Sequence, residues 1–168
     1  HDLERFETTA VSFGPDIEER MRARLRRSFG RFVDVRAKSD REVVRMLRDW
    51  EIDIAVDLKG FTAGNRMGIF SLRPAPIQVN YLGYPGTAGA QYIDYIIADR
   101  YVIPPGYDAF YAEKVVRLPD SYQVNDSKRR IAVDTANRGA AGLADTGFVF
   151  WGFNNGTQST PEILEFGM

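Results

Sequence analysis

The sequence predicts an α/β fold built on a parallel β-sheet, with helices covering both of its faces. Short apolar runs typical of strands alternate along the chain with segments that have helical spacing. The strand-like runs, such as residues 52–58 and 95–98, show little alternation of apolar and polar residues, as is typical of strands buried on both faces. Together these observations indicate a Rossmann-like fold class.

The first half of the chain alternates expected strands and helices. Residues 6–13 form the first strand, helical spacing follows over about 16–29, and residues 32–35 form a short extended segment. Ser39 and Glu42 have the spacing of a capping box, in which each side chain satisfies a backbone amide at the start of a helix. That helix is expected to reach about residue 51, and a strong strand follows at once.

In the second half, a short helix over residues 67–72 is expected to end where Pro74 and Pro76 follow, because proline lacks a backbone donor and restricts the residue before it. Thr160 as N-cap and Pro161 at the first helical position predict a further helix near the end of the chain. Strands are expected over residues 77–82, 95–98, 115–118 and 148–153.

These elements divide the chain into three regions. Residues 1–120 are expected to form one Rossmann-like lobe, and residues 147–168 to begin a second one. Residues 121–146 are polar and rich in Gly and Ala, with weak periodicity, which indicates a connection between the lobes. The sequence begins without Met and ends where the last helix has barely begun, so we expect it to be part of a longer protein.

The composition excludes several classes of function. The net charge is −1, which gives no basic excess for binding nucleic acid or an anionic membrane. The Arg-rich segment 20–31 is interpreted as a solvated helix face beside an apolar stripe of Met21, Leu25 and Phe29. No apolar run is long enough to span a bilayer, and the absence of Cys excludes disulfides and fits a cytoplasmic protein. The single His is His1, so the chain cannot complete a His-based triad or metal site.

Three Gly- or Asn-rich loops are the candidate ligand sites. In parallel sheets, ligands bind at the carboxyl ends of strands, which selects residues 59–66, 83–89 and 154–159. The loops contain neither a dinucleotide fingerprint nor a phosphate-binding loop motif. Asp53 and Asp57 are interpreted as structural rather than as a catalytic carboxylate pair. Aromatic residues near these loops suit a sugar or a peptide, although core packing is the stronger interpretation: Phe61, Tyr81, Tyr84 and Tyr92.

Residues 53–99 resemble a known family. The segments Leu-Arg-Pro-Ala-Pro-Ile-Gln at 72–78 and Leu-Gly-Tyr-Pro-Gly-Thr at 82–87 resemble the signature of the O-GlcNAc transferase and SPINDLY family, glycosyltransferase family 41. The resemblance implies a two-lobed GT-B architecture, of which this chain supplies the N-terminal lobe and the first strand of the C-terminal lobe. It also implies inverting transfer of N-acetylglucosamine from UDP-GlcNAc to Ser or Thr of acceptor proteins, with no metal or other cofactor, and TPR-type helical repeats upstream.

The resemblance assigns roles residue by residue. It places Leu82 and Gly83 against the donor sugar and its phosphate, and Phe61 in a loop that faces the acceptor cleft. The remaining members of the implied site are Asn154 and Asn155 beside the donor diphosphate, and Thr160 at the start of the helix behind them.

Gln158 departs from the family pattern. Many relatives carry Lys at this position, where it neutralises charge on the leaving UDP, and its loss could cost on the order of 10²-fold in rate. Gln158 favours one alternative, a catalytically weak pseudoenzyme that serves as a protein-binding module. A second alternative, O-fucosyl transfer from GDP-fucose, also stays open, because the resemblance includes SPINDLY-type members. The essential His residues of the family fall upstream of His1, so we expect the isolated chain to be inactive.

Overall fold

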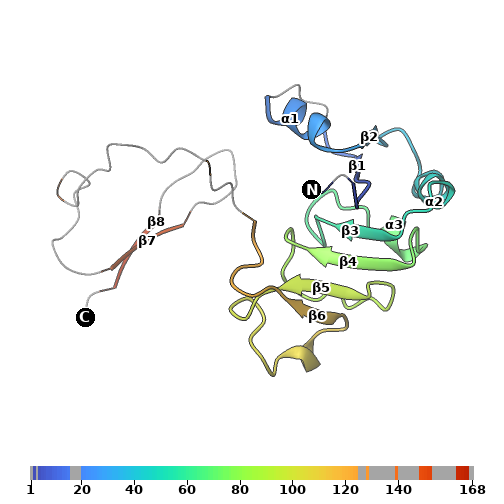
Figure 1. Ribbon diagram of the computed structural model, residues 1–168. Coiled ribbons are helices and arrows are strands. Elements are labelled where there is room, and N and C mark those ends of the chain that lie inside the picture. Colours follow the sequence, from blue (N-terminus) through green and yellow to red (C-terminus); the bar gives the residue numbers. More distant parts are fainter. Residues whose placement is uncertain are drawn as a thin grey trace. The chain divides into compact units, whose positions relative to one another are not determined.

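The computed structural model describes residues 2, 4–15, 20–124, 128, 139, 148–152 and 162–166. The chain divides into two compact units, His1–Asn125 and Asp126–Met168. The first unit contains β1 (Thr9–Ser12), α1 (Arg20–Ser28), β2 (Arg31–Asp34), α2 (Asp40–Asp49), β3 (Ile54–Asp57), α3 (Met67–Ser71), β4 (Ile77–Tyr81), β5 (Tyr95–Ala98), the 3₁₀ helix η1 (Asp108–Phe110) and β6 (Lys114–Arg117), and the second contains β7 (Phe148–Gly152) and β8 (Glu162–Phe166) (Figure 1).

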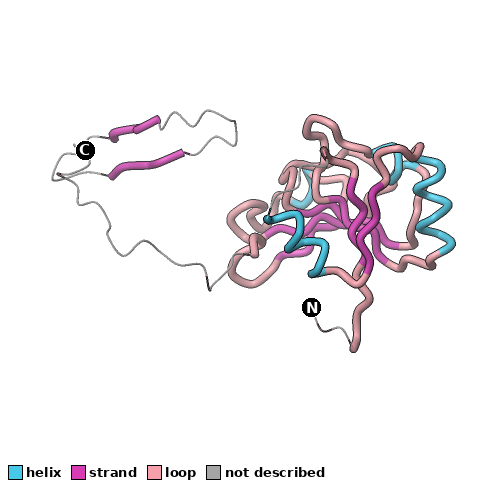
Figure 2. Tube along the Cα trace, turned by 90° about the horizontal axis from the view of Figure 1, so that it is seen from above, coloured by secondary structure: helices cyan, strands magenta, loops and turns pink. Residues whose placement is uncertain are grey.

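The strands of the first unit form two parallel groups. Strands β3, β4, β5 and β6 pair in sequence order in one four-stranded sheet, and β1 pairs with β2. Because every pairing in the larger sheet is parallel, the carboxyl ends of its strands meet at one edge (Figure 1). The strands lie at the centre of the unit, with helices and loops around them (Figure 2). The predicted α/β class with a parallel sheet is confirmed.

One face of the four-stranded sheet is much better covered than the other. The face that carries Gln78, Asn80 and Ile96 is buried, with each of these side chains at most 1% exposed. On the opposite face, the register partners Ile54 and Ile77 are 53% and 38% exposed. Val79, on the same face as Ile77, is 7% exposed, so the described residues cover this face only in part, whereas the apolar composition of the strands predicted that both faces are covered. The composition of a strand indicates that both of its faces are apolar, but it does not identify the segment that covers each face.

The capping box at the start of α2 is confirmed. The Ser39 hydroxyl accepts from the Glu42 amide at 3.3 Å, and the Glu42 carboxylate accepts from the Ser39 amide at 2.7 Å. The hydrogen bond from the Ser39 hydroxyl, followed by that from its amide, lowers the pKa of Glu42. The helix then buries Val43, Val44 and Leu47 in a core shared with β1, β2 and α3.

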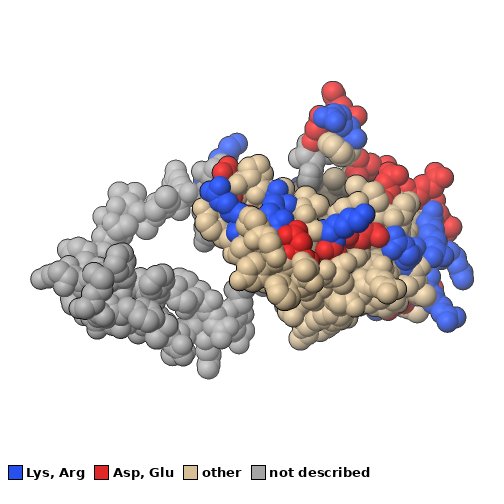
Figure 3. Space-filling view, turned by 90° about the horizontal axis from the view of Figure 1, so that it is seen from below, with Lys and Arg blue, Asp and Glu red and all other residues tan. Residues whose placement is uncertain are grey.

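Helix α1 is more exposed than the predicted apolar stripe required. Leu25 is 45% exposed, so its predicted burial is wrong, whereas Phe29 is half-buried. The Arg side chains account for much of the packing here, because the guanidinium groups of Arg22 and Arg26 lie 5.4 and 5.3 Å from the centre of the Phe32 ring. In the view of Figure 3, acidic and basic side chains lie beside one another in a band across the described part of the chain, and the surface below this band carries few charges.

The predicted helix near the end of the chain is wrong. Residues Glu162–Phe166 form strand β8, which pairs antiparallel with β7, Phe148–Gly152. Thr160 and Pro161, the expected start of the helix, lie outside the described residues. Capping signals are local and do not report the antiparallel pairing with β7, which supplies the backbone hydrogen bonds of this segment.

Asp99 ties the end of β5 to the chain beyond β6. Its carboxylate is 4% exposed and accepts from the amides of Tyr101 at 2.9 Å, Val102 at 2.8 Å and Tyr122 at 2.9 Å. Asp99 therefore shapes the turn that follows β5. The Tyr122 amide and then the Val102 amide lower the pKa of Asp99.

Among the described helices, none combines the length and apolar composition needed to cross a lipid bilayer.

The Asp99→Asn substitution should reduce the stability of the chain in a pH-dependent way. Folding lowers the pKa of Asp99, so its stabilisation is fully present above the unfolded value of about 4 and is lost as the pH falls through the folded value. The difference in free energy of unfolding between wild type and variant should therefore be largest at neutral pH and shrink below about pH 4. Denaturant unfolding across this range measures it. The exposed control Asp53→Asn should change little, and a difference for Asp99→Asn that is independent of pH would contradict the assignment.

The Ser39→Ala substitution should destabilise the chain by about 1 kcal/mol, because it removes the hydroxyl that accepts from the Glu42 amide. Chemical denaturation of the purified chain measures the change. Ser71→Ala is the matched control, since the Ser71 hydroxyl is exposed and only donates to the Gly68 carbonyl within α3. Equal effects of the two substitutions would show that the cap does not stabilise α2.

Candidate active-site edge

Two loops meet at the carboxyl edge of the four-stranded sheet. The loop after β3 begins at Leu58, and the loop after β4 begins at Leu82. A Cβ atom placed on Gly83 would lie 2.1 Å from the Leu58 carbonyl oxygen, so the second loop rests directly on the backbone of the first. Gly60, with a φ of +55°, fits in turn against Tyr84, whose Cβ would lie 2.3 Å from an added Cβ. The two loops therefore fit together only because each carries a glycine where the other approaches.

Leu82 holds a strained backbone conformation at this edge. Its φ is +70°, which is uncommon for a residue with a side chain, and the Gly83 amide donates to the Tyr81 carbonyl at 2.9 Å. This hydrogen bond closes a γ-turn centred on Leu82, the strained form with a positive central φ. Such strain persists only where the surrounding structure fixes it, and it concentrates at functional sites. The Leu82 side chain is 40% exposed.

The loop after β3 is fixed by Asp57. This carboxylate is 6% exposed and accepts from the amides of Lys59 at 3.0 Å and Gly60 at 2.9 Å. Asp53 lies exposed before the other end of β3. The structural interpretation of these residues is therefore confirmed for Asp57, which caps its own loop.

The loop after β4 is fixed from two sides by polar groups that the sequence interpretation missed. The Asn80 amide, 1% exposed, donates to the carbonyls of Tyr84 at 3.2 Å and Gly86 at 3.3 Å. Glu113, 4% exposed, accepts from the Thr87 hydroxyl at 2.7 Å and from the Ala88 amide at 2.6 Å. The only local signal for Asn80 was a polar residue inside an apolar strand.

Phe61 lies beside the same loop. Its side chain is 50% exposed, and its ring meets that of Tyr84 edge to face, with the centroids 6.2 Å apart. The Tyr81 hydroxyl donates to the Tyr122 carbonyl, and Tyr92 packs against a buried cluster, so these two aromatics serve packing. The structure brings Phe61, Leu82 and Gly83 together, and their contacts with donor and acceptor stay predictions.

The other predicted site residues, Asn154, Asn155, Gln158 and Thr160, lie outside the described residues. In the part of the chain that is described, no three His, Cys, Asp or Glu side chains gather in a way that could hold a metal ion. The chemistry available at this edge is therefore that of exposed backbone groups in a fixed turn, an apolar Leu side chain and two aromatic rings.

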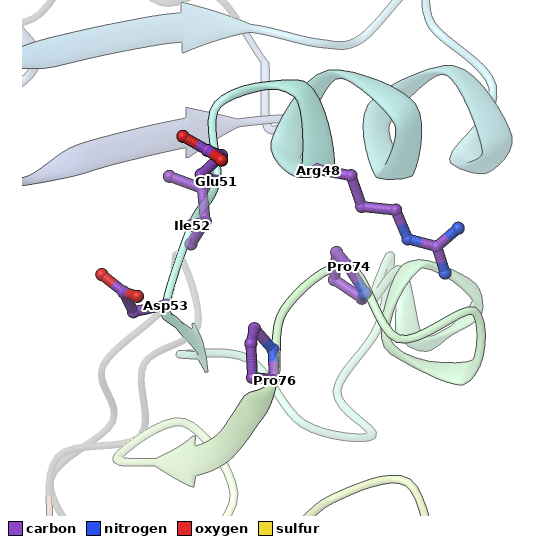
Figure 4. A pocket seen from close by; sticks show the side chains of 6 residues that line it. All are labelled: Arg48, Glu51, Ile52, Asp53, Pro74 and Pro76. Atoms are coloured by element: carbon purple, nitrogen blue, oxygen red, sulfur yellow. The ribbon is translucent and has the colours of Figure 1, made fainter.

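A shallow hollow of ≈ 270 Å³ lies away from these loops (Figure 4). Two of its walls come from the residues that precede β3 and β4, at the amino ends of those strands. The Arg48 side chain donates to the carbonyl of Arg73 across the gap between α2 and the segment before β4. Because ligands of parallel sheets bind at the carboxyl edge, this hollow is not the candidate site. Its lining consists of Arg48, Glu51, Ile52, Asp53, Pro74 and Pro76.

The Gly83→Ala substitution should destabilise the chain by about 1–3 kcal/mol, because the new methyl group would overlap the Leu58 carbonyl and force the two loops apart. Gly14→Ala is the matched control: nothing lies within 4 Å of an added Cβ there, and a change within about 0.5 kcal/mol is expected. Thermal unfolding of both variants measures the difference. A tolerated alanine at position 83 would show that the loops do not fit as described.

Comparisons with known proteins agree with this geometry. The model of the family described as "Glycosyl transferase family 41" matches residues 1–157. The probable UDP-N-acetylglucosamine–peptide N-acetylglucosaminyltransferase SEC of Arabidopsis thaliana is 37% identical over 169 residues, which cover 98% of this chain and 17% of that protein. The corresponding SPINDLY protein of Petunia hybrida is 35% identical over 147 residues, covering 87% of this chain and 15% of that one. The chain thus spans less than a fifth of these curated relatives.

A solved structure of a Thermobaculum terrenum O-GlcNAc transferase mutant superposes with a TM-score of 0.69 and 36% identity, over 73% of this chain and 23% of that one. This likeness confirms the predicted Rossmann-like class, that of a lobe in a GT-B glycosyltransferase. The match of the family model, together with the identities to the SEC and SPINDLY relatives, shows that the chain belongs to glycosyltransferase family 41.

Proposed function

We propose that the full protein transfers N-acetylglucosamine from UDP-GlcNAc to Ser or Thr hydroxyls of proteins, by inversion and without a metal ion. The observation that carries the proposal is the strained Leu82–Gly83 turn, packed on the loop after β3 at the carboxyl edge of the sheet. The relatives are named as probable UDP-N-acetylglucosamine–peptide N-acetylglucosaminyltransferases. These names support UDP-GlcNAc as the donor and proteins as the acceptors.

The described residues supply one wall of the active site in this proposal. The Leu82–Gly83 turn meets the donor sugar and phosphate, since a turn that is already fixed costs no ordering when the donor binds. Phe61, half-exposed beside Tyr84, faces the acceptor. The resemblance to the family adds Asn154, Asn155, Gln158 and Thr160 to the residues that we expect to bind the donor. We further propose that the protein works in the cytoplasm and that TPR-type repeats upstream recruit its acceptor proteins.

The experiment uses the longer protein that contains this chain. The protein is incubated with a cell lysate and either labelled UDP-GlcNAc or labelled GDP-fucose, and protein-bound label is measured with and without a chelator. We expect incorporation from UDP-GlcNAc that the chelator does not reduce, released under alkaline conditions that cleave links to Ser and Thr. The isolated chain, which spans less than a fifth of the curated relatives, should give none.

The other outcomes each contradict the proposal in a different way. Incorporation from GDP-fucose alone would assign O-fucosyl transfer. No incorporation from either donor by a folded protein would favour a protein-binding module in which Gln158 has replaced a needed charge. Gln158→Lys then separates these cases, because a restored leaving-group charge should raise the rate by on the order of 10²-fold only in a protein that is otherwise a transferase.

A further inference from the structure

Glu113 is a buried carboxylate whose two oxygens both serve the loop after β4. It lies directly before β6, two strands away from the strand that begins the loop, and is 4% exposed. One oxygen accepts from the Thr87 hydroxyl at 2.7 Å, and the other from the Ala88 amide at 2.6 Å. Two accepting oxygens are the hydrogen-bonding pattern of an ionised carboxylate. Burying such a group is costly unless it is hydrogen-bonded, and here the loop provides the donors.

The other contacts of Thr87 fix the direction of its hydrogen bond with Glu113. Its hydroxyl oxygen already accepts from the amides of Gly89 at 3.0 Å and Ala112 at 3.2 Å. The single hydroxyl proton is therefore directed to Glu113. One hydroxyl and one carboxylate in this way join two segments of the chain, residues 87–89 and residues 112–113 before β6. Networks of this kind are rigid when every member is satisfied.

The same loop begins with the strained turn at Leu82. A residue with a φ of +70° keeps that conformation only while its surroundings hold it there. Asn80 holds the near half of the loop through the carbonyls of Tyr84 and Gly86, and Glu113 holds the far half through Thr87 and Ala88. Asn80 belongs to the strand that leads into the loop, whereas Glu113 fixes the loop from the residue directly before β6.

We propose that Glu113 is a positioning residue for the transferase reaction. Its carboxylate closes the loop of residues 83–89 from the β6 side, so that the Leu82–Gly83 turn keeps the conformation in which it meets the nucleotide-sugar donor. Glu113 does not itself touch the donor and acts through Thr87 and Ala88. The inference rests on the proposed function, because it names the residue that shapes the donor side of that same site.

The test compares Glu113→Gln and Thr87→Val with wild type in the longer protein. Gln has nearly the same shape, but only one of its two terminal atoms accepts, so one of the two loop donors loses its partner. Val keeps the shape of Thr and removes the hydroxyl. We expect the KM for UDP-GlcNAc to rise about tenfold in each variant, the equivalent of one hydrogen bond, with kcat and the KM for the acceptor within about twofold of wild type.

Two further variants separate positioning from general stability. Thr87→Ser keeps the hydroxyl and should restore nearly the wild-type KM for the donor. Asp108→Asn removes an exposed carboxylate of η1 that pairs with Arg117 of β6. No hydrogen bond joins this carboxylate to residues 83–89 in the described part of the chain, so the substitution should leave the donor KM unchanged. Wild-type donor KM in Glu113→Gln would overturn the proposal. A fall in kcat that follows a lowered melting temperature, with the donor KM unchanged, would also overturn it.

Failure of the proposed function gives a different signature from failure of this inference. If the wild-type protein transfers neither sugar, the function fails, and the positioning role is then read from amide hydrogen exchange. Faster exchange of Ala88 and Gly89 in Glu113→Gln than in wild type, with Asp108→Asn unchanged, would support the closing of the loop by Glu113. Equal exchange in all three proteins would overturn it.

Discussion

The contact between Gly83 and the Leu58 carbonyl is the constraint on which the rest of the site depends. It brings the loops after β3 and β4 together at the carboxyl edge, where the topology of a parallel sheet already gathers strand ends. Donor contact was the expected reason for a glycine at position 83. The structure gives a different reason, because the space that a side chain would need is filled by the neighbouring backbone. The glycine is thus explained by loop packing before any ligand is considered.

Buried polar side chains hold the loops at this edge of the sheet in one conformation by hydrogen bonds to the loop backbone. Several of them lie at or just beyond the ends of strands and bind the backbone of the loops rather than one another. Gln78 extends the pattern, since its side-chain amide donates to the carbonyls of Phe70 and Tyr92 and ties α3 to the segment before β5. Their hydrogen bonds to the backbone offset much of the loss of water and leave the loops few alternative conformations, although Gln78 Oε1 and Asn80 Oδ1 are buried without a partner. The set comprises Asp57, Gln78, Asn80, Asp99 and Glu113.

Features that depend on neighbours in sequence could be predicted, and features that depend on distant partners could not. The capping box at Ser39 and the end of α3 before Pro74 follow from local backbone chemistry, and both were predicted correctly. The strands β3 to β6 were found because apolar runs mark them. By contrast, the strand at Glu162–Phe166 depends on its pairing with β7, which capping signals do not report. Glu113 was overlooked as a site residue because the loop that it binds lies about 25 residues away in the chain.

The reciprocal fit of the two loops has a consequence for how this edge can change over evolutionary time. A larger residue at position 60 collides with Tyr84, and one at position 83 collides with the backbone at Leu58. Neither collision is relieved by a single substitution in the same loop, because the obstacle belongs to the other one. At position 83 the obstacle is a backbone carbonyl, which no substitution removes, whereas at position 60 the effect of a change depends on the residue at position 84. Descendants of this protein are free to diversify the outer surface of each loop while inheriting the contact between them as a unit.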